Sequence, residues 1–284
     1  MHFTLDSVTL ELTAVCNLRC TICPLGRGEL KRSRTLMPVE LVRDILTENS
    51  HFTRVNLNNW GEPLLHPRFA EILNLTNTLA PQAKVYFATN ATLLDDALSG
   101  VLLSAKIHEI HFSVDGVGPH YEHVRGTGYQ DVSQRIRAFI AHRARLHSSV
   151  RVCIKAVVCA ATEAGMDDLV GEWRGVVDEI RLQPLLEFGD RGSRRSAPCP
   201  ELRNSYVTVL SDGRVTPCCA DYNGALTIGH AGEETLESIW NGERAERLRA
   251  SHDTGAFPEF CLRCTEYRTD KCAERFAVNG DPKA

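Results

Sequence analysis

Residues 8–24 read VTLELTAVCNLRCTICP, an apolar run followed directly by three cysteines spaced C-x3-C-x2-C. Three thiolates on one short loop are typical of ligands for a soft metal, either zinc or an iron–sulfur cluster. Structural zinc needs four ligands, and the nearest histidine, His2, lies before the apolar run. Cys16, Cys20 and Cys23 therefore indicate a 4Fe–4S cube with one iron that lacks a protein ligand, an open position where a substrate or cofactor binds.

The apolar run at residues 8–12 is the first of six predicted strands, which are separated by amphipathic stretches. Several of these strands are nearly continuous in Val, Ile and Leu, as in a parallel sheet buried on both faces. The other strands are predicted at 54–57, 85–88, 107–114, 150–158 and 179–182, and helices at 38–47, 67–79, 93–103, 131–146 and 163–176. Six strands are too few for a closed eight-stranded barrel. We expect an α/β fold, either a partial (β/α)6 TIM-like barrel of parallel strands or a doubly wound sheet, with ligands at the carboxyl ends of the strands.

The composition changes at Glu187, where the polar stretch EFGDRGSRRSAPCP (187–200) is typical of a linker. We therefore expect a core domain at 1–186 and a small C-terminal domain at 187–284. In the second part, 206–210 and 214–217 predict a β-hairpin around Asp212-Gly213, and 235–250 predicts one helix.

The chain has 284 residues, 11 cysteines and a formal net charge of −4. This charge balance argues against nucleic acid as the main partner, because phosphate neutralisation needs a clustered basic surface. No run approaches the ~20 apolar residues that span a bilayer, and the N-terminus lacks the form of a signal peptide. We therefore expect a cytoplasmic protein with no membrane contact. In such a protein, an odd number of cysteines favours metal-binding or catalytic thiols over a disulfide framework.

The loop at 11–24, ELTAVCNLRCTICP, resembles the signature loop of the radical SAM enzymes, both in its residues and in its place after the first strand. Ile22 stands where that family usually has an aromatic residue. The resemblance implies that the open iron is chelated by the amino and carboxylate groups of S-adenosylmethionine. Reductive cleavage, with electrons from a partner such as flavodoxin or ferredoxin, then yields a 5′-deoxyadenosyl radical that abstracts hydrogen from a substrate carbon.

Four later motifs, each at a predicted strand end, resemble further parts of this family. They are Trp60-Gly61-Glu62-Pro63 (GGEP in the family, so that Trp60 replaces a glycine), Ala88-Thr89-Asn90-Ala91 (TNG), Phe112-Ser113-Val114-Asp115-Gly116 (ISLDG) and His123-Val124-Arg125-Gly126. The resemblance implies that Glu62 and its backbone hold the methionyl ammonium, Ser113 approaches the ribose, and Arg125 pairs with the methionyl carboxylate. We expect cofactor contacts from Gly61, Glu62, Asn90, Ser113, Asp115 and Arg125. Singly, these residues are also compatible with a plain turn, a helix cap or a surface charge.

Four cysteines of the last third, Cys199, Cys218, Cys261 and Cys264, resemble the ligands of the auxiliary-cluster domain of radical SAM enzymes. This domain is called SPASM in its long form, which carries two extra clusters, and twitch in its short form. Four thiolates suffice for one fully ligated auxiliary 4Fe–4S cluster, which indicates the twitch form. A zinc site on the same thiolates is the alternative.

Cys153, Cys159, Cys219 and Cys272 remain. Cys153 and Cys159 are expected to pack as small hydrophobes, although Cys159 lies near a strand end from which it could reach the barrel mouth. Cys219 follows a proposed cluster ligand on the segment that should face the substrate, so we expect it to be catalytic as a hydrogen donor. Cys272 is either an extra ligand or an inert tail residue.

Two fates of a substrate radical are relevant, since short twitch enzymes include both aminoglycoside epimerases and an aminocyclitol dehydrogenase. A thiol that donates hydrogen from the opposite face epimerises the carbon, whereas loss of a proton and an electron turns the alcohol into a ketone. We expect epimerisation at a carbinol carbon of an amino sugar or aminocyclitol, with Cys219 as the donor. Dehydrogenation of the same substrates is the first alternative, followed by a peptide-modifying maturase and then a non-catalytic iron–sulfur or zinc protein. Candidate contacts to an amino sugar, each otherwise an ordinary solvated or capping residue, are Gln183, Glu187, Asp190 and Asp221.

Overall fold

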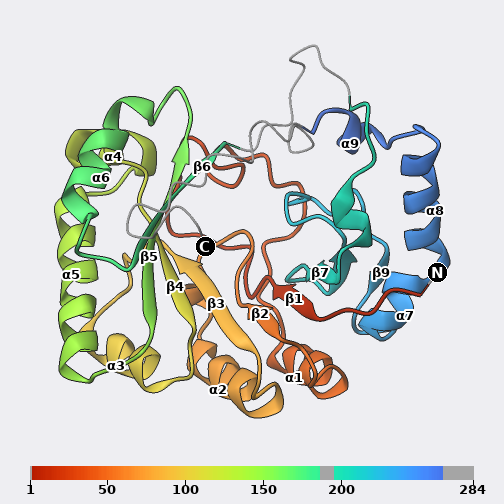
Figure 1. Ribbon diagram of the computed structural model, residues 1–284, viewed down its shortest axis with the longest axis horizontal. Helices are drawn as coiled ribbons and strands as arrows, with labels where there is room; N and C mark the ends of the chain where they lie inside the picture. Colours follow the sequence, from red (N-terminus) through yellow and green to blue (C-terminus); the bar gives the residue numbers. More distant parts are fainter. Residues whose placement is uncertain (1, 186–194, 265–284) are drawn as a thin grey trace.

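The computed structural model describes residues 2–185 and 195–264, which are organised around one nine-stranded sheet (Figure 1). The strand order is β6-β5-β4-β3-β2-β1-β7-β8-β9, and every neighbouring pair from β1 to β6 is parallel. The six parallel strands are β1 (Ser7–Leu10), β2 (Arg54–Asn56), β3 (Lys84–Thr89), β4 (Glu109–Ser113), β5 (Arg151–Val158) and β6 (Glu179–Pro184). Their sequential order confirms the predicted α/β fold with an open, six-stranded parallel half.

Helices connect the successive parallel strands and lie along the outer side of the sheet (Figure 1). They are α1 (Val39–Glu48), α2 (Phe69–Leu79), α3 (Asp96–Ser104), α4 (Gly118–Arg125), α5 (Tyr129–Arg145) and α6 (Met166–Trp173), with 3₁₀ turns at Pro63–Leu65, Glu163–Gly165 and Pro200–Arg203. In α1, Val39, Val42 and Ile45 recur at helical spacing and are all buried against the sheet. Helix α4 is not among the predicted helices, because glycines surround it; Gly126 ends it in the left-handed conformation, at φ +70°.

The C-terminal part continues the same sheet. Strand β7 (Tyr206–Val209) pairs in parallel with β1, and β8 (Arg214–Thr216) and β9 (Gly229–His230) extend the sheet in antiparallel register. The predicted hairpin is confirmed, and Gly213 in its turn has a φ of +87°. Because β1 pairs with both β2 and β7, the two halves share a backbone ladder, and the division at residue 187 stays a proposal.

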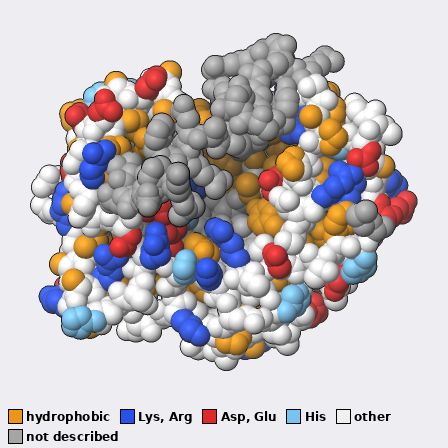
Figure 2. All heavy atoms as spheres, in the orientation of Figure 1, with side chains coloured by type: hydrophobic (Ala, Val, Ile, Leu, Met, Phe, Trp, Pro, Cys, Tyr) orange, Lys and Arg blue, Asp and Glu red, His pale blue; other side chains and the backbone are white. Residues whose placement is uncertain are grey.

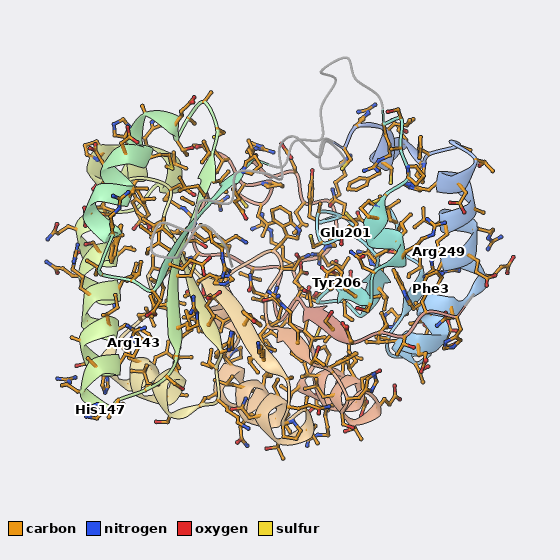
Figure 3. All side chains as sticks on the ribbon, viewed as in Figure 1. Phe3, Arg143, His147, Glu201, Tyr206 and Arg249 are labelled. Atoms are coloured by element: carbon orange, nitrogen blue, oxygen red, sulfur yellow. The ribbon has the colours of Figure 1, made fainter. Side chains whose placement is uncertain are left out.

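The single helix predicted at 235–250 is wrong. Two helices, α7 (Leu236–Asn241) and α8 (Glu243–Asp253), meet at Gly242, whose ψ of 169° is extended, and a short α9 (Glu259–Leu262) follows. The break lets the Asn241 amide exchange hydrogen bonds with the backbone of Phe3, at 2.8 and 2.9 Å. The Arg249 guanidinium also lies 4.4 Å from the centre of the Phe3 ring, so the N-terminal segment is held against these helices (Figure 3).

The hydrophobic core is continuous between sheet and helices, and it includes the buried rings of Phe87, Phe112 and Trp173. Acidic and basic side chains are interspersed on the face shown in Figure 2. Within residues 2–185 and 195–264, every helix is too short or too polar to cross a bilayer.

Candidate active site

A cavity of about 480 Å³ opens at the carboxyl ends of the parallel strands. Its wall brings together all the residues predicted for the first cluster and for the cofactor, namely Cys16, Cys20, Cys23, Gly61, Glu62, Asn90, Ser113, Asp115 and Arg125. Cys219, from the C-terminal part, borders the same cavity. Residues from six separate segments therefore meet at one point, as expected for ligands bound at the ends of parallel strands.

We call Cys16, Cys20 and Cys23 the loop cysteines. Burial raises the pKa of the Cys16 thiol to about 11, and the charges of Glu62 and of the other two thiols add to the rise. Burial also raises the pKa of Cys20, and the nearby Arg125 partly offsets that effect. Thiols with raised pKa values are protonated at neutral pH, so metal binding here must displace protons.

Glu62 is buried, and both oxygens of its carboxylate accept hydrogen bonds from other residues of the protein. Its Oε1 accepts hydrogen bonds from the Thr89 hydroxyl at 2.7 Å and from the Leu64 N–H at 3.1 Å, and its Oε2 accepts one from the Asn90 N–H at 2.8 Å. Burial raises the pKa of this carboxyl to about 7 despite these bonds. The side chain thus fastens the turn after β2 to the end of β3, and a contact with the methionyl ammonium stays a prediction.

Gly61 packs its backbone directly on the cysteine loop. Its φ is +92°, and a Cβ at this position would lie 2.2 Å from the Thr13 carbonyl oxygen and 2.8 Å from that of Val15. The next N–H, that of Glu62, donates to the Val15 carbonyl at 2.9 Å. Only glycine fits this approach, so the Gly61-Glu62 turn supports the cysteine loop and is not an ordinary solvated turn.

Asn90 also holds the cysteine loop from the side of β3. Its amide donates to Asn17 Oδ1 at 2.9 Å and lies 3.9 Å from the Cys16 sulfur, while its Oδ1 accepts from the Thr92 hydroxyl at 2.6 Å. Thr92 in turn accepts from the Asn17 amide at 2.8 Å. This closed ring of hydrogen bonds fixes the position of Cys16 relative to the β3 end.

Asp115 and Arg125 form a buried ion pair in the cavity wall, with Arg125 beside Cys20. Asp115 Oδ2 lies 2.7 Å from Arg125 Nη2, and its Oδ1 accepts from the Val157 N–H at 2.7 Å. Arg125 is therefore not a surface charge, and its Nε is buried without a hydrogen-bond partner. A buried unpaired N–H is costly, so this atom suits an anionic group such as a carboxylate in the cavity. Ser113 lies nearby at the end of β4, opposite Lys155 of β5.

Cys199, Cys218, Cys261 and Cys264, which we call the auxiliary cysteines, form the second group. Burial raises the pKa of Cys261 to about 12, and the charges of Cys199 and Cys264 contribute to the rise. Burial likewise raises the pKa of Cys218, with Cys264 among its neighbours. Cys264 thus lies within electrostatic reach of Cys199, Cys218 and Cys261, which come from three distant segments. Within residues 2–185 and 195–264 no three such side chains are gathered around one metal position, and a four-thiolate cluster stays a prediction.

Two residues beside the auxiliary cysteines were not predicted as part of a site. Arg195 is 4% exposed and donates to the Cys261 carbonyl at 3.4 Å, and its charge counteracts the burial effect on the pKa of Cys261. His252 is fully buried, and its Nδ1 accepts the Cys199 N–H at 3.1 Å. Neither residue stands out in the sequence, since Arg195 lies in a polar linker and His252 on a charged helix.

A second set of unpredicted residues joins the two cysteine groups. The Arg32 guanidinium pairs with the buried Glu11 at 2.5 Å and also donates to the Tyr222 carbonyl at 2.6 Å. Glu11 accepts the N–H of Ser211 at 3.1 Å and that of Trp60 at 3.3 Å. A buried, fully paired carboxylate therefore ties the cysteine loop, the turn after β2 and the C-terminal hairpin together.

The structure decides several of the remaining predictions. Cys153 is fully buried in β5, which confirms its place in the core, and Cys159 is half-buried. Gln183 borders the cavity. Asp221 is wrong as a substrate contact, because it is fully buried and its carboxylate accepts from two backbone N–H groups and the Thr216 hydroxyl. Outside the described residues lie Glu187, Asp190 and Cys272.

Comparisons with known proteins agree with this geometry. Residues 10–155, more than half of the chain, match the model of the Radical SAM superfamily. The chain belongs to the radical SAM superfamily. Residues 199–265 of this radical SAM protein match the SPASM iron–sulfur cluster-binding domain. It is therefore a radical SAM enzyme with a cofactor-binding 4Fe–4S cluster, S-adenosylmethionine and auxiliary iron–sulfur chemistry, and not a non-catalytic zinc protein.

Among similar proteins is the S-adenosyl-L-methionine-dependent 2-deoxy-scyllo-inosamine dehydrogenase of Niallia circulans, which is 22% identical over 85% of this chain and 84% of its own. The crystal structure of BtrN in complex with AdoMet and 2-DOIA superposes with a TM-score of 0.64, at 19% identity, over 93% of this radical SAM enzyme and 94% of BtrN. Native anSMEcpe with bound AdoMet superposes with a TM-score of 0.71, at 16% identity, over 96% and 93% of the two chains. These structures share the fold.

Proposed function

We propose that this radical SAM enzyme dehydrogenates a carbinol carbon of an aminocyclitol or a related amino sugar. The observation that carries the proposal is the position of the auxiliary cysteine Cys218, whose neighbour in the chain borders the cavity of the loop cysteines, so that a cluster held by Cys218 would lie within reach of an electron from a substrate in the cavity. The similarity to the 2-deoxy-scyllo-inosamine dehydrogenase, which has a comparable length, supports the same reading. It favours the dehydrogenation alternative over the epimerisation expected from the sequence.

Each group of residues has a role in this proposal. The loop cysteines would hold the cluster that binds S-adenosylmethionine, and the auxiliary cysteines would hold a second 4Fe–4S cluster. Glu62 and Asn90 would orient the cysteine loop, as their hydrogen bonds indicate. Arg125, with its unpaired Nε, would bind the methionyl carboxylate, and Asp115 would hold Arg125 in place.

When bound, the cofactors supply a carbon radical that removes one hydrogen atom and an iron–sulfur acceptor for one electron. The substrate would lose its carbinol C–H hydrogen atom to the 5′-deoxyadenosyl radical, which becomes 5′-deoxyadenosine, and would lose one electron to the acceptor and the hydroxyl proton to solvent or a base. The product is a ketone, and atoms and charge balance. The chain's own residues place the carbinol beside Cys219 and shield the radical from water.

The remaining cavity wall suits a small polar ring. Asn59 Nδ2 is buried without a hydrogen-bond partner, and Gln183 and Lys155 also border the cavity. The unpaired donor of Asn59 favours a ligand with a hydroxyl group at this point, because the bond made removes a desolvation cost.

The test is an anaerobic incubation of protein reconstituted with iron and sulfide, using S-adenosylmethionine, a reductant and 2-deoxy-scyllo-inosamine. We expect one ketone for each 5′-deoxyadenosine, detected by mass spectrometry after oxime formation. Deoxyadenosine formed in the presence of this and related aminocyclitols, without any ketone, would contradict the proposal. The predicted reducing partner is tested by running the same assay with flavodoxin, and separately with ferredoxin, as the source of electrons.

Epimerisation is the second candidate, and the exposed thiol of Cys219 on the cavity wall favours it. In D2O a thiol donor carries exchangeable deuterium, so an epimer would contain one deuterium at the inverted carbon and no ketone would form. Conversion to a ketone without incorporation of deuterium into recovered substrate would exclude epimerisation.

A further inference from the structure

Trp60 occupies the place where the resembling family motif has a glycine, and it makes contacts that glycine cannot make. Its indole Nε1 donates to the Cys219 carbonyl oxygen at 2.9 Å. Its ring meets that of Tyr222 edge to face, with 5.5 Å between the centroids. One side chain from the turn after β2 thus touches the C-terminal segment at both ends of residues 219–222.

The backbone of Trp60 is held independently of its side chain. Its N–H donates to Glu11 Oε2 at 3.3 Å, and the adjacent Gly61-Glu62 turn is fixed on the cysteine loop. The indole therefore projects from a rigid support toward a segment whose first residue follows the auxiliary cysteine Cys218. Trp60 also lines the cavity next to Cys219.

The far end of the same segment has separate anchors. The Tyr222 hydroxyl donates to Glu29 at 3.2 Å, and Asn223 exchanges bonds with Glu29 and Lys31. These anchors hold residues 222–223, whereas the indole bond acts at Cys219, next to the cluster ligand. Loss of the indole N–H should therefore loosen the Cys219 end while the Tyr222 end stays in place.

We propose that Trp60 is a positioning residue that holds the Cys218–Cys219 segment, and with it the auxiliary cluster, at the edge of the S-adenosylmethionine cavity. The consequence for turnover rests on the proposed function. An electron leaving the substrate radical has to reach the auxiliary cluster before the radical is quenched, so a displaced segment lowers the ketone formed per S-adenosylmethionine cleaved. Cleavage itself depends on the loop cysteines and continues.

The experiment compares wild type, Trp60→Phe and Trp173→Phe, all loaded with both clusters and matched by iron content. Trp60→Phe keeps an aromatic ring but loses the N–H. Trp173→Phe is the matched control, since its indole donates to the Tyr129 hydroxyl at 3.1 Å in the core of the helical layer. The first readout is amide hydrogen exchange of peptides covering 217–225, where the Asp221 N–H bonds to the Cys218 carbonyl.

We expect exchange in 217–225 to be about fivefold faster in Trp60→Phe, equivalent to about 1 kcal/mol at 1.4 kcal/mol per tenfold change. The ratio of ketone to deoxyadenosine should fall by a similar factor, and Trp173→Phe should change neither quantity. Equal exchange in Trp60→Phe and wild type would overturn the proposal. If wild type forms no ketone at all, the proposed function fails, and the exchange comparison alone then decides on Trp60.

Discussion

The loop cysteines and the auxiliary cysteines lie in contrasting surroundings. The loop cysteines border an open cavity and face a buried arginine that has an unpaired N–H. The auxiliary cysteines come from three distant segments, and Arg195 and His252 pack around them. An open site suits a cofactor that enters and leaves at every turnover, whereas an enclosed site suits a permanent group. The surroundings therefore predict a different purpose for each group of cysteines.

The largest expected effects come from removing one thiol in each group. Cys20→Ala should abolish deoxyadenosine formation, because the cluster that activates S-adenosylmethionine is lost. Cys261→Ala should keep deoxyadenosine formation but lose the ketone. Iron analysis should fall from about eight to about four per chain in each variant. If Cys261→Ala also abolished cleavage, the two groups would not be functionally separate.

Replacement of Glu62 tests how strongly the region around the loop cysteines depends on the buried hydrogen bonds of this carboxylate. Glu62→Gln keeps the shape but turns an N–H toward the Asn90 N–H, which loses a charge-assisted bond and leaves two donors facing each other. We expect the free energy of unfolding to fall by about 3 kcal/mol, measured by denaturant titration of the metal-free protein. Glu71→Gln, in an exposed pair with Arg68, is the control and should change little.

The same residue predicts a pH dependence. Burial raises the pKa of Glu62 from its ordinary value of 4.5 to about 7, so the folded state binds more protons than the unfolded state between these values. The Glu62 contribution to stability is therefore full below pH 4.5 and decreases as pH rises toward about 7. Wild type should lose stability relative to Glu62→Gln over this range, and a difference that grew with pH would contradict the sign.

Replacement of Arg195 tests whether the buried charge beside the auxiliary cysteines affects the cluster that they would hold. Arg195→Gln removes a buried positive charge, which should lower the reduction potential of the auxiliary cluster by tens of millivolts while the first cluster keeps its potential. Redox titration followed by electron paramagnetic resonance measures both. Arg263→Gln is the control, because this exposed side chain, paired with Glu259, is screened by water. Equal shifts in both variants would show that burial of Arg195 is unimportant.

Cys219 should give the smallest effect if dehydrogenation is correct. Cys219→Ala then leaves the ketone yield within about twofold of wild type, since its backbone carbonyl, which accepts the Trp60 bond, is retained. The measurement is ketone per deoxyadenosine under anaerobic conditions. Loss of an epimeric product in this variant would instead support the role of hydrogen donor.

Much of the fold was predictable from local patterns. The apolar runs gave all six parallel strands, and the Asp212-Gly213 turn gave the hairpin, because strand and turn signals depend on neighbouring residues. Helix α4 and the break at Gly242 were not predicted. Helix α4 is flanked by glycines, which hide its pattern, and the break at Gly242 depends on contacts distant in the sequence, those of Asn241 with Phe3.

The candidate site divides in a similar way. The loop cysteines and the Gly61-Glu62 turn could be located from short motifs, because residues that are neighbours in the chain make up each of them. The burial of Arg125, the structural role of Asp221 and the contact of Trp60 with Cys219 could not be foreseen in this way. A motif records which atoms are available, whereas burial and hydrogen-bond partners depend on segments that become neighbours only after β7 joins β1.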